Sequence, residues 1–174
     1  MPVACANNPE PTPVDTASKE PTSESPTVTK TPSASPSPSA AAGSVEEQLE
    51  AATVAFYAAV TKAYATLDPA PIEAVIVPHS RAGGFYLNDI ATVRKKGHRF
   101  SDVPEYTVDN FEVEPQDADP SHEIVTFKLL ADFSEEVDEK GRSVEEFPAG
   151  SANGRIEFMK EGDTWLVLSQ RFEE

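Results

Sequence analysis

The stretch GRIEFMKEGDTWLV, residues 154–167, decides the fold that this sequence predicts. Its centre, Glu161-Gly162-Asp163, has the composition of a tight turn. Apolar and polar residues alternate on both sides of the turn, which is typical of strands with one buried face. The pattern therefore predicts a β-hairpin with arms over residues 152–160 and 164–172. The apolar residues expected on its buried face are Ile156, Phe158, Trp165 and Val167.

The same two-residue period occurs upstream of this hairpin. Residues 107–113 are expected to form a first strand, and residues 123–133 have the clearest alternation in the chain. Asp138-Glu139-Lys140-Gly141 has the composition of a turn. The strand over residues 123–133 is expected to bury Val125, Phe127, Leu129, Ala131 and Phe133.

Before residue 100 the apolar residues recur every three to four positions, which is typical of helices. Ser44 and Glu47 form a capping-box pattern that opens a helix of about six turns, and Asp68-Pro69 ends it. Pro69 suits the start of a second, short helical segment that reaches residues 72–77. A third helix is expected over residues 80–96, closed by Gly97. Helices followed by antiparallel strands predict an α+β domain, with the helices packed on one face of the sheet.

This order of elements resembles the nuclear transport factor 2-like superfamily, which includes ketosteroid isomerase and scytalone dehydratase. The resemblance covers residues 44–174; the hairpin of residues 154–167 carries it best, and Phe56-Tyr57 in the first helix also fits. It implies a cone-shaped domain of three N-terminal helices packed on a curved antiparallel sheet. It also implies a pocket between helices and sheet, where enzymes of the superfamily use a carboxylate or histidine base together with a tyrosine or acid.

The resemblance makes several polar and aromatic residues candidates for lining this pocket. Tyr57 and Tyr64 are seven residues apart and share one helix face. The alternative is that such tyrosines pack their rings in the core while their hydroxyls reach the rim. The candidate pocket-lining residues are Tyr57, Tyr64, Tyr86 and Asp89, with His79 and Asp132 as two further candidates.

No motif in the sequence assigns catalysis, a cofactor or a metal. His79, His98 and His122 lack the spacing of metal ligands, and neither a Gly-x-Ser-x-Gly motif nor a phosphate-binding glycine loop occurs. We therefore predict no catalytic, cofactor-binding or metal-binding residue. A non-enzymatic binding or interaction module is the first hypothesis, and an isomerase-like or dehydratase-like enzyme or ligand carrier is the second. The second requires an open cone, and aromatic residues filling it would argue against it: Phe56, Phe127, Phe158 and Trp165.

One basic cluster interrupts an acidic sequence at the end of the third helix, where cations offset the helix dipole. It is a candidate docking patch for an acidic partner, and plain solvation of a charged helix end is the alternative. The patch comprises Arg94, Lys95, Lys96 and Arg99, with His98 between them. Acidic residues of one hairpin are expected to keep a sheet edge soluble and unpaired, and weak binding of a divalent cation is the alternative. They are Asp132, Glu135, Glu136, Asp138, Glu139, Glu145 and Glu146.

Cys5 is the only cysteine of the chain. With small residues before it and a proline-, serine- and threonine-rich stretch after it, Cys5 resembles the lipid-attachment cysteine of bacterial lipoproteins. The whole arrangement is similar to uncharacterised lipoproteins of high-GC Gram-positive bacteria, although many of these carry a cysteine pair where residues 78–84 here have none. Only four residues precede Cys5, too few for a signal peptide. Three explanations are open: the true start codon lies upstream, the signal peptide was removed from this sequence, or Cys5 is a free thiol.

Composition divides the chain into three expected parts. Residues 1–5 are the remnant of a signal and lipid-attachment region, and residues 44–174 form one domain. Residues 6–43 contain eight prolines and no aromatic residue, which predicts a disordered linker. No apolar run is long enough for a transmembrane helix.

The net charge of −16 disfavours nucleic acid and anionic lipid headgroups as partners. We expect an extracytoplasmic protein held at the cell membrane by lipid on Cys5, or a cytoplasmic one if no upstream signal peptide exists. An envelope protein or a small apolar ligand is the expected partner, and no oligomeric state is predicted.

Overall fold

The computed structural model of the protein describes residues 43–115 and 119–173. Within these residues, three helices precede seven strands, in the order α1, α2, α3 and then β1 to β7. The predicted α+β class is therefore confirmed. Cys5 and nearly all of the predicted linker lie outside the described residues, so those predictions stay predictions.

Helix α1, Val45–Thr66, starts where the capping box predicted. Glu47 donates its backbone N–H to the Ser44 hydroxyl over 3.2 Å, and Ser44 donates its own N–H to the Glu47 carboxylate over 2.8 Å. These two bonds satisfy amide groups that the helix itself leaves without partners. The helix ends at Leu67, whose left-handed backbone (φ 52°) breaks the hydrogen-bond pattern.

The short helix α2, Ala70–Glu73, ends earlier than the expected limit at residue 77. Asp68, two residues before Ala70, accepts the Ala70 N–H over 3.1 Å. The chain then becomes extended because Ile76 forms a parallel bridge with Val167. Pairing with β7 thus replaces the last helical turn that local sequence favoured.

Helix α3, Gly84–Lys96, begins four residues later than predicted. Gly83 precedes it with φ 68°, a conformation that a glycine adopts without strain, and a Cβ there would lie 2.8 Å from Ile72 Cγ2. Gly97 closes the helix in a left-handed conformation, as expected.

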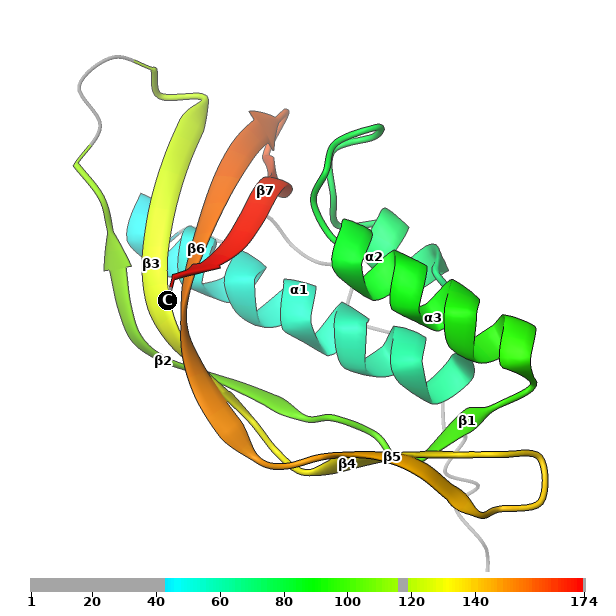
Figure 1. The fold of residues 1–174 in the computed structure, drawn as a ribbon. Helices are drawn as coiled ribbons and strands as arrows, with labels where there is room; N and C mark the ends of the chain where they lie inside the picture. The colour runs from blue at the N-terminus through cyan, green and yellow to red at the C-terminus, as the bar shows by residue number, and fades with distance from the viewer. Residues whose placement is uncertain (1–42, 116–118, 174) are drawn as a thin grey trace, which may run out of the picture. The chain divides into compact units, whose positions relative to one another are not determined.

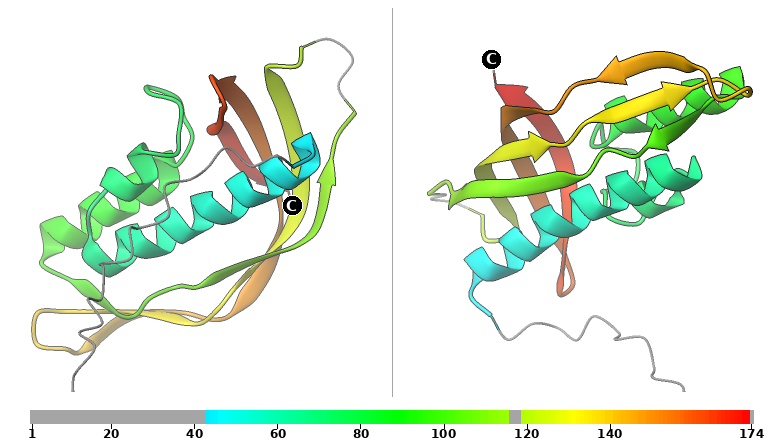
Figure 2. Two further views of the ribbon diagram at one scale, coloured as in Figure 1. Left: turned by 180° about the vertical axis from the view of Figure 1, so that it is seen from behind. Right: turned by 90° about the horizontal axis from the view of Figure 1, so that it is seen from below.

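The larger sheet is antiparallel throughout, and the predicted C-terminal hairpin forms one half of it. The strand order is β2–β3–β6–β7, with β2 over Tyr106–Val113, β3 over His122–Ala131, β6 over Gly150–Glu161 and β7 over Thr164–Glu173. The register shifts between Asp109 and Glu112 in β2 and between Glu157 and Phe158 in β6. Such irregularities bend strands, and the long strands curve around α1 in both figures (Figures 1 and 2).

The smaller sheet has the order β1–β4–β5. Its strands are β1 over Arg99–Asp102, β4 over Ser134–Val137 and β5 over Ser143–Phe147. The predicted strand over residues 123–133 ends two residues early, at Ala131, although the Asp132 N–H still donates to Glu105 O over 3.0 Å beside the pairing of Ala131 with Tyr106. The expectation that Phe133 is buried is wrong, because it follows the end of β3 and is 44% exposed.

The core lies between α1 and the concave face of the larger sheet, with α2 and α3 beside the C-terminal half of α1 (Figure 1). Four aromatic residues from both layers fill the depth of the cone: Phe56, Phe127, Phe158 and Trp165. No helix of the described segments is long and apolar enough to cross a membrane.

Candidate functional site

A small pocket lies where α1 and α3 meet the junction of the two sheets. Its volume is about 150 Å³, and we call it the rim pocket. The helices contribute Tyr64, Phe85 and Asp89, and the strands and their connections contribute Phe100, Pro104, Tyr106, Ala131, Asp132, Ser134, Phe147 and Pro148.

All four tyrosines of the chain gather at this end of the domain. Tyr57 and Tyr64 are two turns apart on α1, so their side chains leave the same face. The Tyr106 ring, at the start of β2, lies 5.4 Å from the Tyr57 ring and 6.5 Å from the Tyr86 ring, between centroids. The Tyr86 ring on α3 is 6.3 Å from that of Tyr64. The cluster thus joins both longer helices to β2.

A tyrosine–carboxylate pair forms the polar part of the rim pocket. Tyr64 donates its hydroxyl to Asp89 Oδ2 over 2.9 Å, which connects α1 to α3. Burial raises the pKa of Tyr64 above its ordinary value, and the neighbouring charge of Asp89 raises it further. A neutral phenol beside a carboxylate serves as a hydrogen-bond donor.

Burial holds the other three phenols in the neutral form as well. It raises the pKa of Tyr106 to about 12, with a smaller contribution from the Asp89 charge. Burial also raises the pKa of Tyr57 and of Tyr86 above the usual value. All four hydroxyls are therefore protonated at neutral pH.

The structure brings together three of the six candidate pocket residues. Tyr64, Asp89 and Asp132 line the rim pocket, whereas Tyr57 and Tyr86 pack behind it with almost no exposed surface. His79 lies in the loop before α3 with φ 63° and is not part of the lining. Contact of any of them with a ligand stays a prediction.

Sequence reasoning missed the apolar wall of the pocket, formed by Phe85, Phe100 and Phe147. These residues come from α3, β1 and β5, which are distant in sequence. No local sequence pattern connects the three residues. The sequence could have predicted only that Phe85 is exposed, because it lies outside the apolar stripe of α3. Only the pairing of β1 with β4, and of β4 with β5, brings the two strand residues together.

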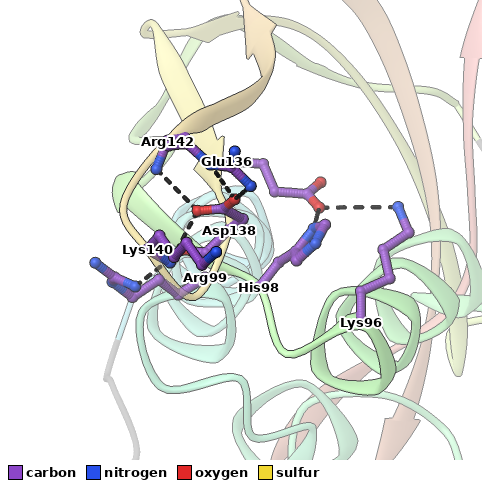
Figure 3. Close-up of polar contacts among 7 residues, drawn as sticks. All are labelled: Lys96, His98, Arg99, Glu136, Asp138, Lys140 and Arg142. Carbon is purple, nitrogen blue, oxygen red and sulfur yellow. Dashed lines mark hydrogen bonds and ion pairs between the residues drawn. The ribbon is translucent and has the colours of Figure 1, made fainter.

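The predicted basic patch lies at the C-terminal end of α3, and part of it is engaged within the domain (Figure 3). Lys96 Nζ lies 3.8 Å from Glu136 Oε1, and Arg99 donates to the backbone oxygen of Asp138 over 3.2 Å. Arg94 and Lys95 are exposed. Binding of an acidic partner to this patch stays a prediction.

The expectation that Glu136 belongs to a solvated edge is wrong, because this side chain is almost completely buried. Its strand, β4, is the middle strand of the smaller sheet, so alternate residues point inwards. His98 Nδ1 lies 2.5 Å from Glu136 Oε1, and Figure 3 shows the carboxylate between His98 and Lys96. The pair gives the buried carboxylate the polar partners that burial requires.

A shallow depression of about 440 Å³ lies beside this cluster, next to the C-terminal ends of α1 and α3. It has charges of both signs, from Asp68 and Arg94, and no aromatic wall. In the described part of the chain no group of three or more His, Cys, Asp or Glu residues is placed to hold a metal ion. The rim pocket is therefore the better candidate site.

No protein-family model matches the chain, and no curated protein matches it. Among solved structures, the intermembrane space region of the chloroplast protein ARC6 is similar, with a TM-score of 0.54 at 13% identity over 73% of this chain and 95% of that one. A member of the NTF2-like family from Streptomyces avermitilis has a TM-score of 0.47 at 15% identity, over 72% of this chain and 93% of that one. An uncharacterised protein with a cystatin-like fold from Caulobacter vibrioides has a TM-score of 0.47 at 12% identity, over 76% and 92%.

These likenesses concern the fold alone. The described elements themselves, three helices followed by a curved antiparallel sheet, have the arrangement that the sequence analysis expected. The activity and ligand of this chain have to be argued from its own pocket.

Proposed function

We propose that the domain binds a small molecule in the rim pocket. The observation that carries this proposal is the convergence of every tyrosine of the chain, and of Asp89, on one end of an otherwise apolar cone. Phenylalanine would fill the same space without the cost of burying a hydroxyl. Tyr64 and Tyr106 line the pocket beside Asp89, with Tyr57 and Tyr86 packed behind them, and this arrangement is better explained by recognition than by packing.

The size of the rim pocket limits the ligand. A cavity of about 150 Å³ holds a molecule of roughly the size of benzene. The aromatic residues Phe56, Phe127, Phe158 and Trp165 occupy the deeper cone, so a steroid-sized substrate has no room there. The pocket suits a compact ligand, or one compact group of a larger molecule that extends into solvent.

Filling the pocket tests this proposal. Ala131 lines it, and Ala131→Phe would place a ring inside it. In ligand-observed NMR with the full chain and a library of compact charged and neutral fragments, the wild type is expected to give hits that Ala131→Phe loses. Ala51→Phe, on an exposed face of α1, is the matched control and should keep them. Identical hits for both variants, with matching melting curves, would rule the pocket out.

The filled cone argues against an isomerase-like or dehydratase-like enzyme acting there, so this second candidate is confined to the rim pocket, where the Tyr64–Asp89 hydrogen bond favours it. Asp89 would accept a proton from the substrate, and neighbouring phenols would donate to the oxyanion that forms. Its test is deuterium incorporation from D₂O into small ketones, followed by NMR. Rates no faster than those of Asp89→Asn would overturn it.

We further propose, from the sequence resemblance, that Cys5 carries lipid and that residues 6–43 tether the domain to a membrane outside the cytoplasm. The support is the composition around Cys5, a residue outside the described part of the chain. Mass spectrometry of the N-terminus after detergent extraction from the native host tests this. An unmodified Cys5 in the soluble fraction would contradict it.

A further inference from the structure

We infer that the rim pocket takes a small organic cation, a quaternary ammonium group. The inference rests on the proposed function, because it names the class of ligand for that same pocket. It follows from three features: the aromatic walls, the two carboxylates and the absence of any positive side chain among the described lining residues.

Five of the eleven residues that line the pocket are aromatic. The Phe100 ring lies between two others, 4.9 Å from Tyr64 and 6.3 Å from Phe147 between centroids. Phe85 sits on the first turn of α3 and is 73% exposed, and its ring lies 5.5 Å from that of Tyr86 between centroids. Ring faces carry partial negative charge and attract ammonium groups, most strongly where several rings surround the cation.

The two carboxylates of the pocket add charge of the matching sign. Asp89 receives the Tyr64 hydroxyl on Oδ2, and in residues 43–115 and 119–173 no side chain bonds to its Oδ1 or to the Asp132 carboxylate. By contrast, the shallow depression near α3 includes Arg94 and His98. The rim pocket is thus the hollow of the described domain with uncompensated negative charge.

A metal ion fits the same charge poorly. Hard cations need six or more oxygen ligands, and phenylalanine rings supply none. The described residues contain no cluster of three candidate ligands. An ammonium group bearing methyl groups, in contrast, can contact rings and carboxylates together, and a pocket of about 150 Å³ accommodates it.

The test compares choline with its uncharged isostere 3,3-dimethylbutan-1-ol, using the full chain labelled with ¹⁵N. Choline should shift the amide signals of pocket residues, including Asp89 and Tyr106. The isostere should bind about fivefold or more weakly, as expected for one cation–aromatic contact. Higher salt should weaken choline binding and leave the isostere unaffected.

Charge variants then locate the effect. Asp89→Asn and Asp132→Asn should each weaken choline binding by about five- to tenfold and weaken binding of the isostere much less. Asp163→Asn, in the exposed β6–β7 turn, removes the same net charge far from the pocket and should have no effect.

The outcomes separate this inference from the proposed function. If the isostere binds the pocket as tightly as choline, the pocket binds ligands but its preference for a cation is refuted. If neither probe shifts pocket signals, the cation inference is refuted, and the fragment library with Ala131→Phe decides independently whether the pocket binds anything.

Discussion

Gly154 shows how one missing side chain controls the packing of the cone. It sits in β6 opposite Phe127 of β3, and a Cβ at this position would lie 2.5 Å from two carbons of the Phe127 ring. Gly154→Ala would therefore force Phe127, or the strand, to move. We expect a loss of about 1–3 kcal/mol in the free energy of unfolding, measured by urea denaturation.

Gly150, in the same strand, is the control for this prediction. A Cβ there would have only the Pro148 oxygen nearby, at 3.9 Å. Gly150→Ala should leave stability unchanged or raise it slightly, because alanine restricts the unfolded chain. Equal effects of the two substitutions would mean that contact with Phe127 is not what excludes a side chain at Gly154.

The burial of Glu136 could not be predicted from the sequence around it. A run of acidic residues is ordinarily solvated, and nothing nearby in the sequence indicates burial. The partner, His98, is 38 residues away, and β1–β4 pairing alone places the two side chains together. Whether a charged residue in β4 is buried depends on the register in which β4 pairs with its neighbours. Sequence patterns do not determine that register in a strand as short as β4.

The β4–β5 hairpin depends on one carboxylate in its turn. Asp138 accepts the backbone N–H groups of Lys140 and Arg142, and its side chain also pairs with that of Arg142 (Figure 3). These bonds, the Arg142 amide first, lower the pKa of Asp138 to about 2. We expect Asp138→Ala to speed hydrogen exchange at Lys140 and Arg142 while core amides stay protected.

The direction of the pKa shift also predicts a pH effect on this turn. Because the folded-state pKa lies below the usual 3.8, the stabilisation is complete above that value and is lost as the pH falls towards 2. Asp163→Ala, in the β6–β7 turn, serves as the control. Unchanged exchange in the Asp138 variant would show that the Gly141 turn forms without the carboxylate.

Sequence predicted best those elements whose signals are local. The capping box located the start of α1, and the turn of residues 161–163 located the last hairpin. The misplaced end of α2 has a tertiary cause, because the bridge between Ile76 and Val167 replaces the last helical turn. There, a contact distant in sequence outweighs local preference.

The rim pocket could be predicted only in part for the same reason. Heptad spacing correctly placed Tyr57 and Tyr64 on one face of α1. The sequence could not show that Tyr64 would line the pocket while Tyr57 packs behind it, since this depends on where α3 and β2 cross α1. The Tyr64–Asp89 hydrogen bond joins two residues that are 25 positions apart and lie on different helices, so it exists only in the assembled domain.

The four tyrosines allow the assembled domain to be tested by one titration. Burial raises each folded-state pKa above the usual tyrosine value of 10.0, with Tyr106 the lowest at about 12. A raised pKa means that the stabilisation is complete below pH 10 and is lost as the pH rises through the folded-state values. The folded protein should therefore show almost no phenolate absorbance at pH 10.5, where the urea-unfolded chain is mostly ionised.

Tyr106→Phe should move the first ionisation step of the folded protein to higher pH. Circular dichroism should show whether ionisation and unfolding coincide. Phenolate absorbance near pH 10 in a chain that is still folded would mean that water reaches the cluster, and the pocket would then be more open than the structure shows.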